Sequence, residues 1–186
     1  MDLRGEIEQF KPFNEQEERD RLQILRWMDT GLNLYTRENG MAHFTASAWV
    51  VSGDRTKVLM AFHKIYQSWA WLGGHADGER DLLQTALREV KEESGVTHVS
   101  PLQSAIFSLE ILTVDGHWKN GEYVSSHLHL NVTYLLTANE RDPLYSKPDE
   151  NSNVAWFLRE EALQVVREPW MNTHIYQKLN AKLECL

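Results

Sequence analysis

The sequence predicts an α/β domain with a mixed β-sheet and an added N-terminal helix. Segments rich in aromatic and β-branched residues, which predict strands, are interspersed with amphipathic segments that predict helices, without strict alternation. The chain has 186 residues, of which 42% are hydrophobic and 25% are charged. This composition is typical of a globular protein, and the length is sufficient for one core of ordinary size.

The first part of the chain, residues 1–40, is predicted to be a helical extension packed on a domain formed by residues 41–186. Within the extension, residues 14–29 predict an amphipathic helix, with Asn14 as its N-cap and Gly31 beyond its end. Its apolar side chains recur at helical spacing and are Leu22, Ile24, Leu25 and Met28.

Five segments of the domain predict strands because they combine β-branched and aromatic residues with partial alternation. They are residues 43–52, 57–63, 103–114, 123–136 and 153–158. Turn dipeptides separate neighbouring strands, at Gly53-Asp54, Asp115-Gly116 and Asn120-Gly121. A polar segment with two prolines, 138–151, predicts a loop. Residues 159–167 and 170–183 predict helices that Pro169 separates.

The clearest helix prediction covers residues 81–94. Asp81 is a suitable N-cap, Gln84 follows three residues later as in a capping box, and Gly95 follows the last helical residue. One face, which we expect to pack on the sheet, carries Leu83, Ala86, Leu87 and Val90.

Three glutamates, Glu89, Glu92 and Glu93, are expected to lie together on a different face of this helix. Like charges at this spacing destabilise a helix by about 0.2–0.5 kcal/mol per pair. The negative end of the helix dipole adds roughly 0.3–1 kcal/mol. Such violations tend to mark function, and carboxylates are ligands that Mg²⁺ prefers. Taken alone, the three residues also fit a solvated acidic face.

The glycine-rich segment 73–79 and the helix that follows it together resemble the Nudix box, G-x5-E-x7-R-E-U-x-E-E-x-G-U, where U is a bulky aliphatic residue. The residues in register are Gly74, Arg88, Glu89, Val90, Glu92, Glu93, Gly95 and Val96. The chain departs from the motif at Arg80, where the box has its first glutamate, and Glu79 lies one residue early. The resemblance covers about residues 40–165 and implies a Nudix-type α/β/α sandwich.

This resemblance implies Mg²⁺-dependent hydrolysis of a diphosphate linkage in a nucleoside diphosphate derivative or similar small molecule, with Mn²⁺ as an alternative metal. The implied metal ligands are Glu89, Glu92, Glu93 and the carbonyl group of Gly73. Glu89 is either a ligand or the base that orients water, and Arg88 holds it in place. The implied catalytic residues are Arg88, Glu89, Glu92 and a loop acid, for which Glu150 is the first candidate and Glu122 the second.

Candidate substrate-binding residues are Gly74, His75, Trp71, His127 and His129. His127 and His129 alternate along a predicted strand and therefore share one side of it, which is either a cleft or a polar outer face. Trp71 and other aromatic side chains could stack on a base, although packing in the core is the alternative. These further aromatic residues are Trp69, Trp118 and Tyr66.

The net charge of −8 and the lack of a Lys/Arg cluster argue against binding to DNA or long RNA. Cys185 is the single cysteine, so no intrachain disulfide is expected. The sequence contains neither a signal-peptide pattern nor an apolar run of membrane-spanning length. We therefore expect a cytoplasmic protein without membrane partners, and the resemblance makes a homodimer plausible.

Two other functions fit the same resemblance. One is a ligand-sensing module without catalysis, although such modules often lose acids that this chain retains. The other is a diphosphate isomerase, whose chemistry uses a cysteine within the domain, whereas Cys185 lies at the tail. RNA decapping is disfavoured by the acidic charge. The residues of the box do not identify the substrate.

Overall fold

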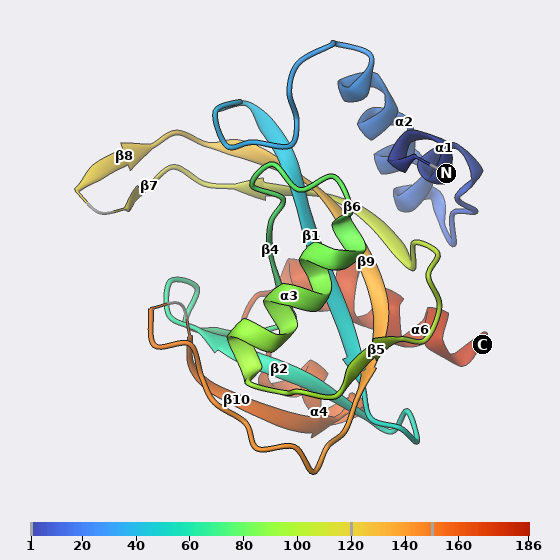
Figure 1. The fold of residues 1–186 in the computed structure, drawn as a ribbon, viewed down its shortest axis with the longest axis vertical. Coiled ribbons are helices and arrows are strands. Elements are labelled where there is room, and N and C mark those ends of the chain that lie inside the picture. Colours follow the sequence, from blue (N-terminus) through green and yellow to red (C-terminus); the bar gives the residue numbers. More distant parts are fainter. Residues whose placement is uncertain (1, 120, 150) are drawn as a thin grey trace.

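The fold is an α/β sandwich around a mixed sheet, as predicted (Figure 1). The computed structural model describes residues 2–119, 121–149 and 151–186. The main strands lie in the order β10 (Asn151–Leu158), β2 (Lys57–His63), β1 (Ala42–Val51), β9 (His127–Ala138) and β5 (Val99–Pro101). β1 and β9 are parallel, whereas the other pairs are antiparallel.

Three further strands extend the sheet. β3 (Ser68–Ala70) pairs with β2, β4 (Leu72–His75) pairs with β1, and β6 (Ser108–Val114) pairs with β9. β7 (His117–Lys119) and β8 (Glu122–Val124) form a separate hairpin that projects from the sheet (Figure 1).

Two predicted strands differ from the observed ones. The segment 123–136 forms β8 and β9 rather than one strand, because the strand pairing is interrupted at residues 125–126, where the Ser126 hydroxyl accepts a hydrogen bond from the Gly116 N–H. The segment 103–114 becomes a strand only at Ser108. The chain before it is bent, and the Phe107 N–H bonds to the Thr133 carbonyl.

Helices cover both faces of the sheet. α3 (Leu82–Ser94) packs on one face, and the C-terminal helices pack on the other (Figure 1). These are α4 (Arg159–Val165), α5 (Pro169–Met171), the π-helical turn η1 (Asn172–Tyr176) and α6 (Gln177–Glu184). The predicted helix 170–183 therefore runs through a π turn, a feature that its sequence pattern does not indicate.

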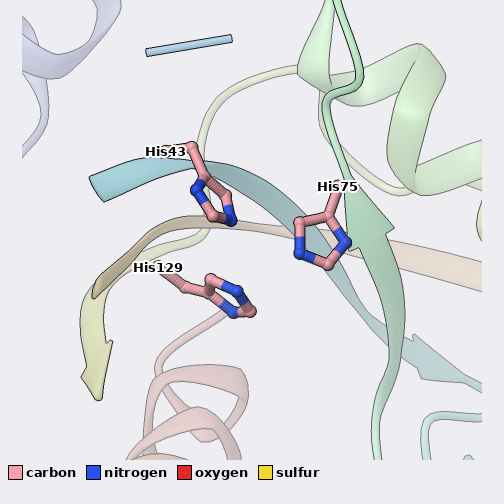
Figure 2. A group of neighbouring side chains, drawn as sticks. All are labelled: His43, His75 and His129. Atoms are coloured by element: carbon pink, nitrogen blue, oxygen red, sulfur yellow. The ribbon is translucent and has the colours of Figure 1, made fainter. Parts of the chain in front are cut away.

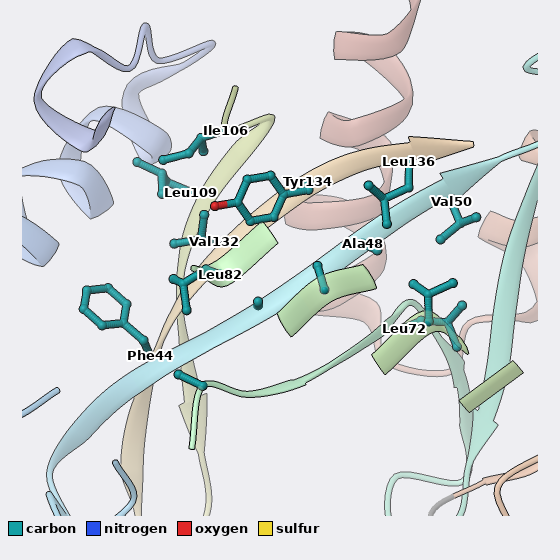
Figure 3. Close-up of a cluster of buried hydrophobic side chains, with 14 of the residues drawn as sticks. Phe44, Ala48, Val50, Leu72, Leu82, Ile106, Leu109, Val132, Tyr134 and Leu136 are labelled. Atoms are coloured by element: carbon teal, nitrogen blue, oxygen red, sulfur yellow. The ribbon is translucent and has the colours of Figure 1, made fainter. Parts of the chain in front are cut away.

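Alternation along β1 divides the core in two. Phe44, Ala48 and Val50 face α3 and contribute to the cluster in Figure 3. Trp49 and Val51 point to the opposite face and pack with side chains of the C-terminal helices. The buried β1 therefore holds both helical layers in place.

Two helices precede the first strand, α1 (Leu3–Gln9) and α2 (Glu15–Met28). The predicted helix at 14–29 is α2, and the Asn14 side chain accepts a hydrogen bond from the Glu17 N–H as its cap. α1 was not predicted, because its seven residues are too few to show helical periodicity. α2 packs against β6, a strand at the edge of the sheet.

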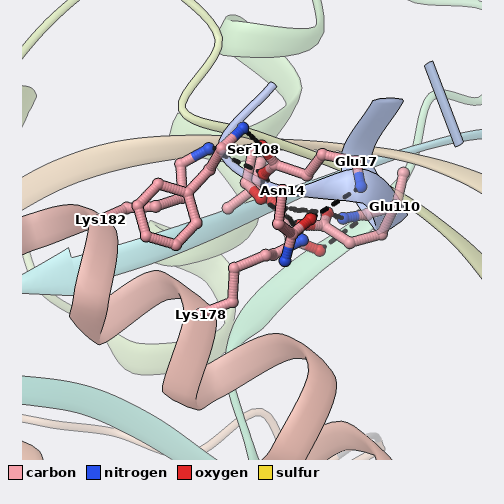
Figure 4. Close-up of polar contacts among 10 residues, drawn as sticks. Asn14, Glu17, Ser108, Glu110, Lys178 and Lys182 are labelled. Carbon is pink, nitrogen blue, oxygen red and sulfur yellow. Dashed lines mark hydrogen bonds and ion pairs between the residues drawn. The ribbon is translucent and has the colours of Figure 1, made fainter. Parts of the chain in front are cut away.

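A buried network of charges joins α2 to α6 (Figure 4). Both Glu17 carboxylate oxygens accept hydrogen bonds from Lys182 Nζ, at 2.7 and 2.8 Å. Lys178 Nζ bonds to the Glu110 carboxylate at 3.0 Å, and Ser108 lies between the two glutamates. Burial raises the pKa of Glu17, but Lys178 and Lys182 outweigh this effect and hold that pKa below its usual value.

Among the described residues, no helix is both long and apolar enough to cross a membrane.

Candidate functional site

The helix α3 begins and ends where its sequence predicts. The Asp81 carboxylate accepts a hydrogen bond from the Gln84 N–H, and Gly95 closes the helix with a φ of 76°, in the left-handed region that glycine favours. Leu82, Ala86 and Val90 are buried against the sheet. The helix is thus anchored at both ends and along one face.

The glutamates of α3 do not share one solvent-facing side, which corrects the sequence-based expectation. Glu89 and Glu93 are buried, with 6% and 5% of their surface exposed, whereas Glu92 is exposed. Residues 82, 86, 89, 90 and 93 form one continuous buried stripe. The expected apolar residues Leu83 and Leu87 are only partly buried at its margin.

The glycine-rich strand β4 lies directly beside these two carboxylates. The Gly73 N–H donates a hydrogen bond of 2.9 Å to Glu93 Oε2. At Gly74, an added Cβ would overlap the Glu89 carboxyl group and lie 2.5 Å from its Oε1. The missing side chain of Gly74 therefore makes room for the Glu89 carboxyl group, that of Gly73 allows β4 to lie close to β1, and β4 forms one wall of the site.

Gly74→Ala should displace the Glu89 carboxylate and leave the fold intact, because the clash falls on the end of a flexible side chain. We expect Mn²⁺ affinity to fall by roughly 10–100-fold, as for changes to groups that orient metal ligands, with little change in the unfolding temperature. Calorimetric Mn²⁺ titration and thermal unfolding would measure the two effects.

Two matched variants separate these effects. Gly40→Ala, where an added Cβ meets nothing within 4 Å, should change neither property. Gly73→Ala should lower the unfolding temperature, because its Cβ would lie 2.5 Å from the Ala46 carbonyl oxygen and 2.7 Å from the Ser47 Cα. Wild-type Mn²⁺ affinity in Gly74→Ala would show that Glu89 is not held at a metal site.

Two cations face the three carboxylates. Arg88 Nη1 lies 3.0 Å from Glu89 Oε1 and 3.8 Å from Glu92 Oε1. Lys147 Nζ, from the loop before β10, lies 3.5 Å from Glu92 Oε2. Arg88 and Lys147 thus stabilise the negative charge of Glu89 and Glu92.

The loop that supplies Lys147 is fixed to the end of α3. The Tyr145 N–H bonds to the Ser94 carbonyl at 2.8 Å, and the buried Asn151 donates through Nδ2 to the Glu93 carbonyl at 3.2 Å. Lys147 and Asn151 could not be predicted from the sequence, because no short-range pattern shows that this loop reaches α3. The predicted loop acid Glu150 lies outside the described residues. Glu122, the second candidate, lies in β8 of the projecting hairpin.

The departure from the Nudix box at Arg80 has a local explanation. Glu79 Oε1 accepts hydrogen bonds from the Arg80 N–H at 2.7 Å and the Asp81 N–H at 2.9 Å, and these bonds lower the pKa of Glu79. The Arg80 guanidinium lies over the Tyr35 ring at 4.9 Å. The shifted glutamate therefore stabilises the turn that enters α3, while Arg80 packs on the N-terminal extension.

The candidate substrate residues divide into two groups. His75, His127 and His129 lie together and form a cluster with His43, which the sequence analysis did not identify. Trp71 packs edge-on against Tyr176, with 5.7 Å between the ring centroids, on the side of the C-terminal helices. Its ring therefore contributes to the second core.

The other aromatic candidates are dispersed. Trp69 packs edge-on against Phe157 at 4.7 Å, whereas Trp118 is 74% exposed on β7 and contacts Tyr123. Tyr66 lies against His63, with ring centroids 4.7 Å apart. None of these three contacts places a ring against the carboxylates of α3.

The family model of the NUDIX domain matches residues 41–179. No curated protein matches the sequence.

Among solved structures, the chain is similar to an Ap4A hydrolase from C. elegans (20% identity, TM-score 0.52, covering 77% of this chain and 98% of that one). It is also similar to a NUDIX-family hydrolase from Clostridium perfringens (20% identity, TM-score 0.53, covering 81% of this chain and 99% of that one). A third similar structure is a Nudix hydrolase from M. smegmatis (15% identity, TM-score 0.55, covering 77% of this chain and 87% of that one). At these identities, the similarity shows a shared fold.

Proposed function

Since the chain belongs to the Nudix family, we propose that it is a Mg²⁺-dependent hydrolase that cleaves a diphosphate linkage in a nucleoside diphosphate derivative or similar small molecule. The arrangement of Glu89, Glu92 and Glu93 beside the glycines of β4 is the observation that carries this proposal. A solvated acidic face would leave all three side chains in water, whereas Glu89 and Glu93 are buried here.

The donor set fits a hard divalent cation. Carboxylate and carbonyl oxygens are the ligands that Mg²⁺ and Mn²⁺ prefer. The space at Gly74 that a Cβ would fill brings the β4 backbone close to Glu89. We propose Glu89, Glu92, Glu93 and the Gly73 carbonyl as ligands. When bound, Mg²⁺ supplies neutralisation of phosphate charge and activation of water.

The remaining roles follow from the contacts of each side chain. Arg88, at 3.0 Å from Glu89, orients this carboxylate, which in turn orients or deprotonates the attacking water. Lys147 lies beside Glu92 and can contact a phosphate oxygen of the substrate. The backbone of Gly74, which lies beside the Glu89 carboxyl group, is a further candidate for substrate contact, whereas His127 contacts His43 and His129 on the opposite face of the sheet.

Phosphate or pyrophosphate release from a panel of diphosphate compounds tests this proposal. The panel should include nucleoside triphosphates, ADP-ribose, dinucleoside polyphosphates and non-nucleotide diphosphates. We expect at least one compound to be hydrolysed with Mg²⁺, and no hydrolysis with EDTA. Binding of a compound without turnover at saturating Mg²⁺ and Mn²⁺ would instead identify a sensing module.

A further inference from the structure

The strand pairing brings three histidines together (Figure 2). They lie on the face of the sheet opposite to that of Gly74, because His75 follows Gly74 directly in β4. His43 of β1 pairs with His129 of the parallel strand β9, and the antiparallel β4 places His75 opposite Thr45, two residues further along β1. Side chains at alternate positions point to the same face. The three ring centroids are consequently separated by 4.9–5.2 Å.

We propose that His43, His75 and His129 form a binding site for a transition-metal ion of the Zn²⁺ class, separate from the glutamates of α3. One ring nitrogen from each histidine lies within 4.8 Å of those of the other two. Three imidazole ligands and one position open to water make up a common four-coordinate zinc site. Imidazole nitrogen favours such ions over Mg²⁺, which prefers oxygen.

The environment of His43 points most directly to a ligand. This side chain is only 3% exposed, and its Nδ1 lies 3.2 Å from the Asn39 carbonyl oxygen. If Nδ1 donates its proton to this carbonyl, the lone pair is on Nε2. That atom is buried and has no hydrogen-bond partner among the described residues. A backbone carbonyl that fixes the tautomer of a histidine in this way is a frequent companion of metal-binding histidines.

Burial favours the neutral form of His43 and His129, the form that metal binding requires. Burial lowers the pKa of His43, and it lowers that of His129 to about 2, with a further contribution from the neighbouring rings. Arg37 and Asp77 are the charged groups that act on His43, and they pair with each other at 2.8 Å. Arg37 lowers the pKa of His43 and Asp77 raises it, so their effects on this ring oppose each other.

His127 closes one side of the cluster. Its ring stacks on His43 with a centroid distance of 5.0 Å, and its Nε2 lies 3.3 Å from Nε2 of His129. Its Nδ1 is 2.8 Å from the Ser125 carbonyl oxygen. His127 thus borders the three proposed ligands and can accept a hydrogen bond from water in the open position.

Only a modest movement is required to complete the site. Zinc–nitrogen bonds of 2.0–2.1 Å in a tetrahedral site separate the nitrogens by about 3.3 Å, so they must approach by up to roughly 1.5 Å. His75 and His129 are partly exposed, whereas His43 is buried. His43, buried and fixed through Nδ1, is the ligand around which they close.

Co²⁺ titration of the untagged protein at saturating Mg²⁺ tests this site, because four-coordinate Co²⁺ has a strong visible absorption. We expect one Co²⁺ per chain with that spectrum, and displacement by Zn²⁺. His75→Asn and His43→Gln should each weaken binding by at least about 100-fold. His75 is the safer position, because it is partly exposed, and circular dichroism checks the fold of each variant.

Two controls locate the ion. His174→Gln removes an exposed histidine that stacks on Trp170, and it should leave Co²⁺ binding unchanged. Glu92→Gln alters the proposed Mg²⁺ site and should also retain the Co²⁺ spectrum. The proposal is overturned if wild-type protein shows no stoichiometric four-coordinate Co²⁺. It is equally overturned if folded His75→Asn binds Co²⁺ like the wild type, or if only Glu92→Gln loses it.

Discussion

Glu92→Gln should lower kcat for diphosphate hydrolysis by roughly 10³-fold, because several kcal/mol of transition-state stabilisation depend on the metal and each 1.4 kcal/mol is a factor of about ten. Glutamine keeps the size of the side chain and removes only its charge. Glu92 is exposed, and its ion pairs with Arg88 and Lys147 are long, so the variant should fold normally. Steady-state kinetics across a Mg²⁺ titration measure the effect.

Glu93→Gln should show a similar loss, although its amide oxygen can still accept the hydrogen bond from Gly73. The matched control is Glu160→Gln, which removes an exposed carboxylate from the first turn of α4 and should keep wild-type activity. If Glu92→Gln and Glu93→Gln both retained full activity and normal Mg²⁺ dependence, the proposed metal site on α3 would be wrong.

Glu17→Gln should lower the free energy of unfolding by about 3–5 kcal/mol, because removal of one partner leaves buried lysine charges uncompensated. Lys182 is hydrogen-bonded to both carboxylate oxygens, and Lys178 lies 3.5 Å from Oε1. Glu17 also accepts a hydrogen bond of 2.7 Å from the Phe13 N–H. For a chain of this length, the unfolding temperature should fall by roughly 6–20 °C.

Two further variants distinguish the contribution of the buried charges to stability from that of surface charges. Glu15 lies in the same first turn of α2 and forms an exposed ion pair with Arg19, with 3.4 Å between Oε1 and Nη2. Glu15→Gln breaks this pair and should change the free energy of unfolding by less than about 1 kcal/mol. The double variant Glu17→Met, Lys182→Met should recover part of the stability lost in Glu17→Gln, because it removes the charge as well as its partner. If Glu17→Gln lowered the free energy of unfolding no more than Glu15→Gln does, the buried network would not stabilise the fold as proposed.

Local signals were sufficient to predict the helix of the candidate site. Asp81 and Gly95 are strong boundary residues, so α3 was predicted to within one residue at its start. Local signals also predicted β1 and β2, because both segments are rich in β-branched and aromatic residues and the turn dipeptide Gly53-Asp54 lies between them. By contrast, α1 is too short to show a helical period, and a break in the strand pairing at residues 125–126 interrupts a segment that otherwise has strand composition.

The surroundings of the site depend on contacts between distant parts of the chain. His43 meets His129 only through the parallel register of β1 and β9, and Asn151 meets Glu93 across 58 positions. Spacing within one segment carries no information on such pairs. The burial of Glu89 was missed for a related reason: the helical period shows which residues share a face, but the glycines of β4 determine how closely the sheet approaches it.

The contact of Glu17 with Lys182 spans 165 positions, which has a consequence for biosynthesis. On the ribosome, α2 emerges before α6 and carries a carboxylate that is buried in the folded protein. Its counter-charge, Lys182, is added 165 positions later. Until Lys182 has left the exit tunnel, burial of Glu17 is strongly unfavourable, which disfavours docking of α2 in its final place on β6. The docking of α2 therefore depends on the synthesis of α6, and long-range closure of this kind is intrinsically slow.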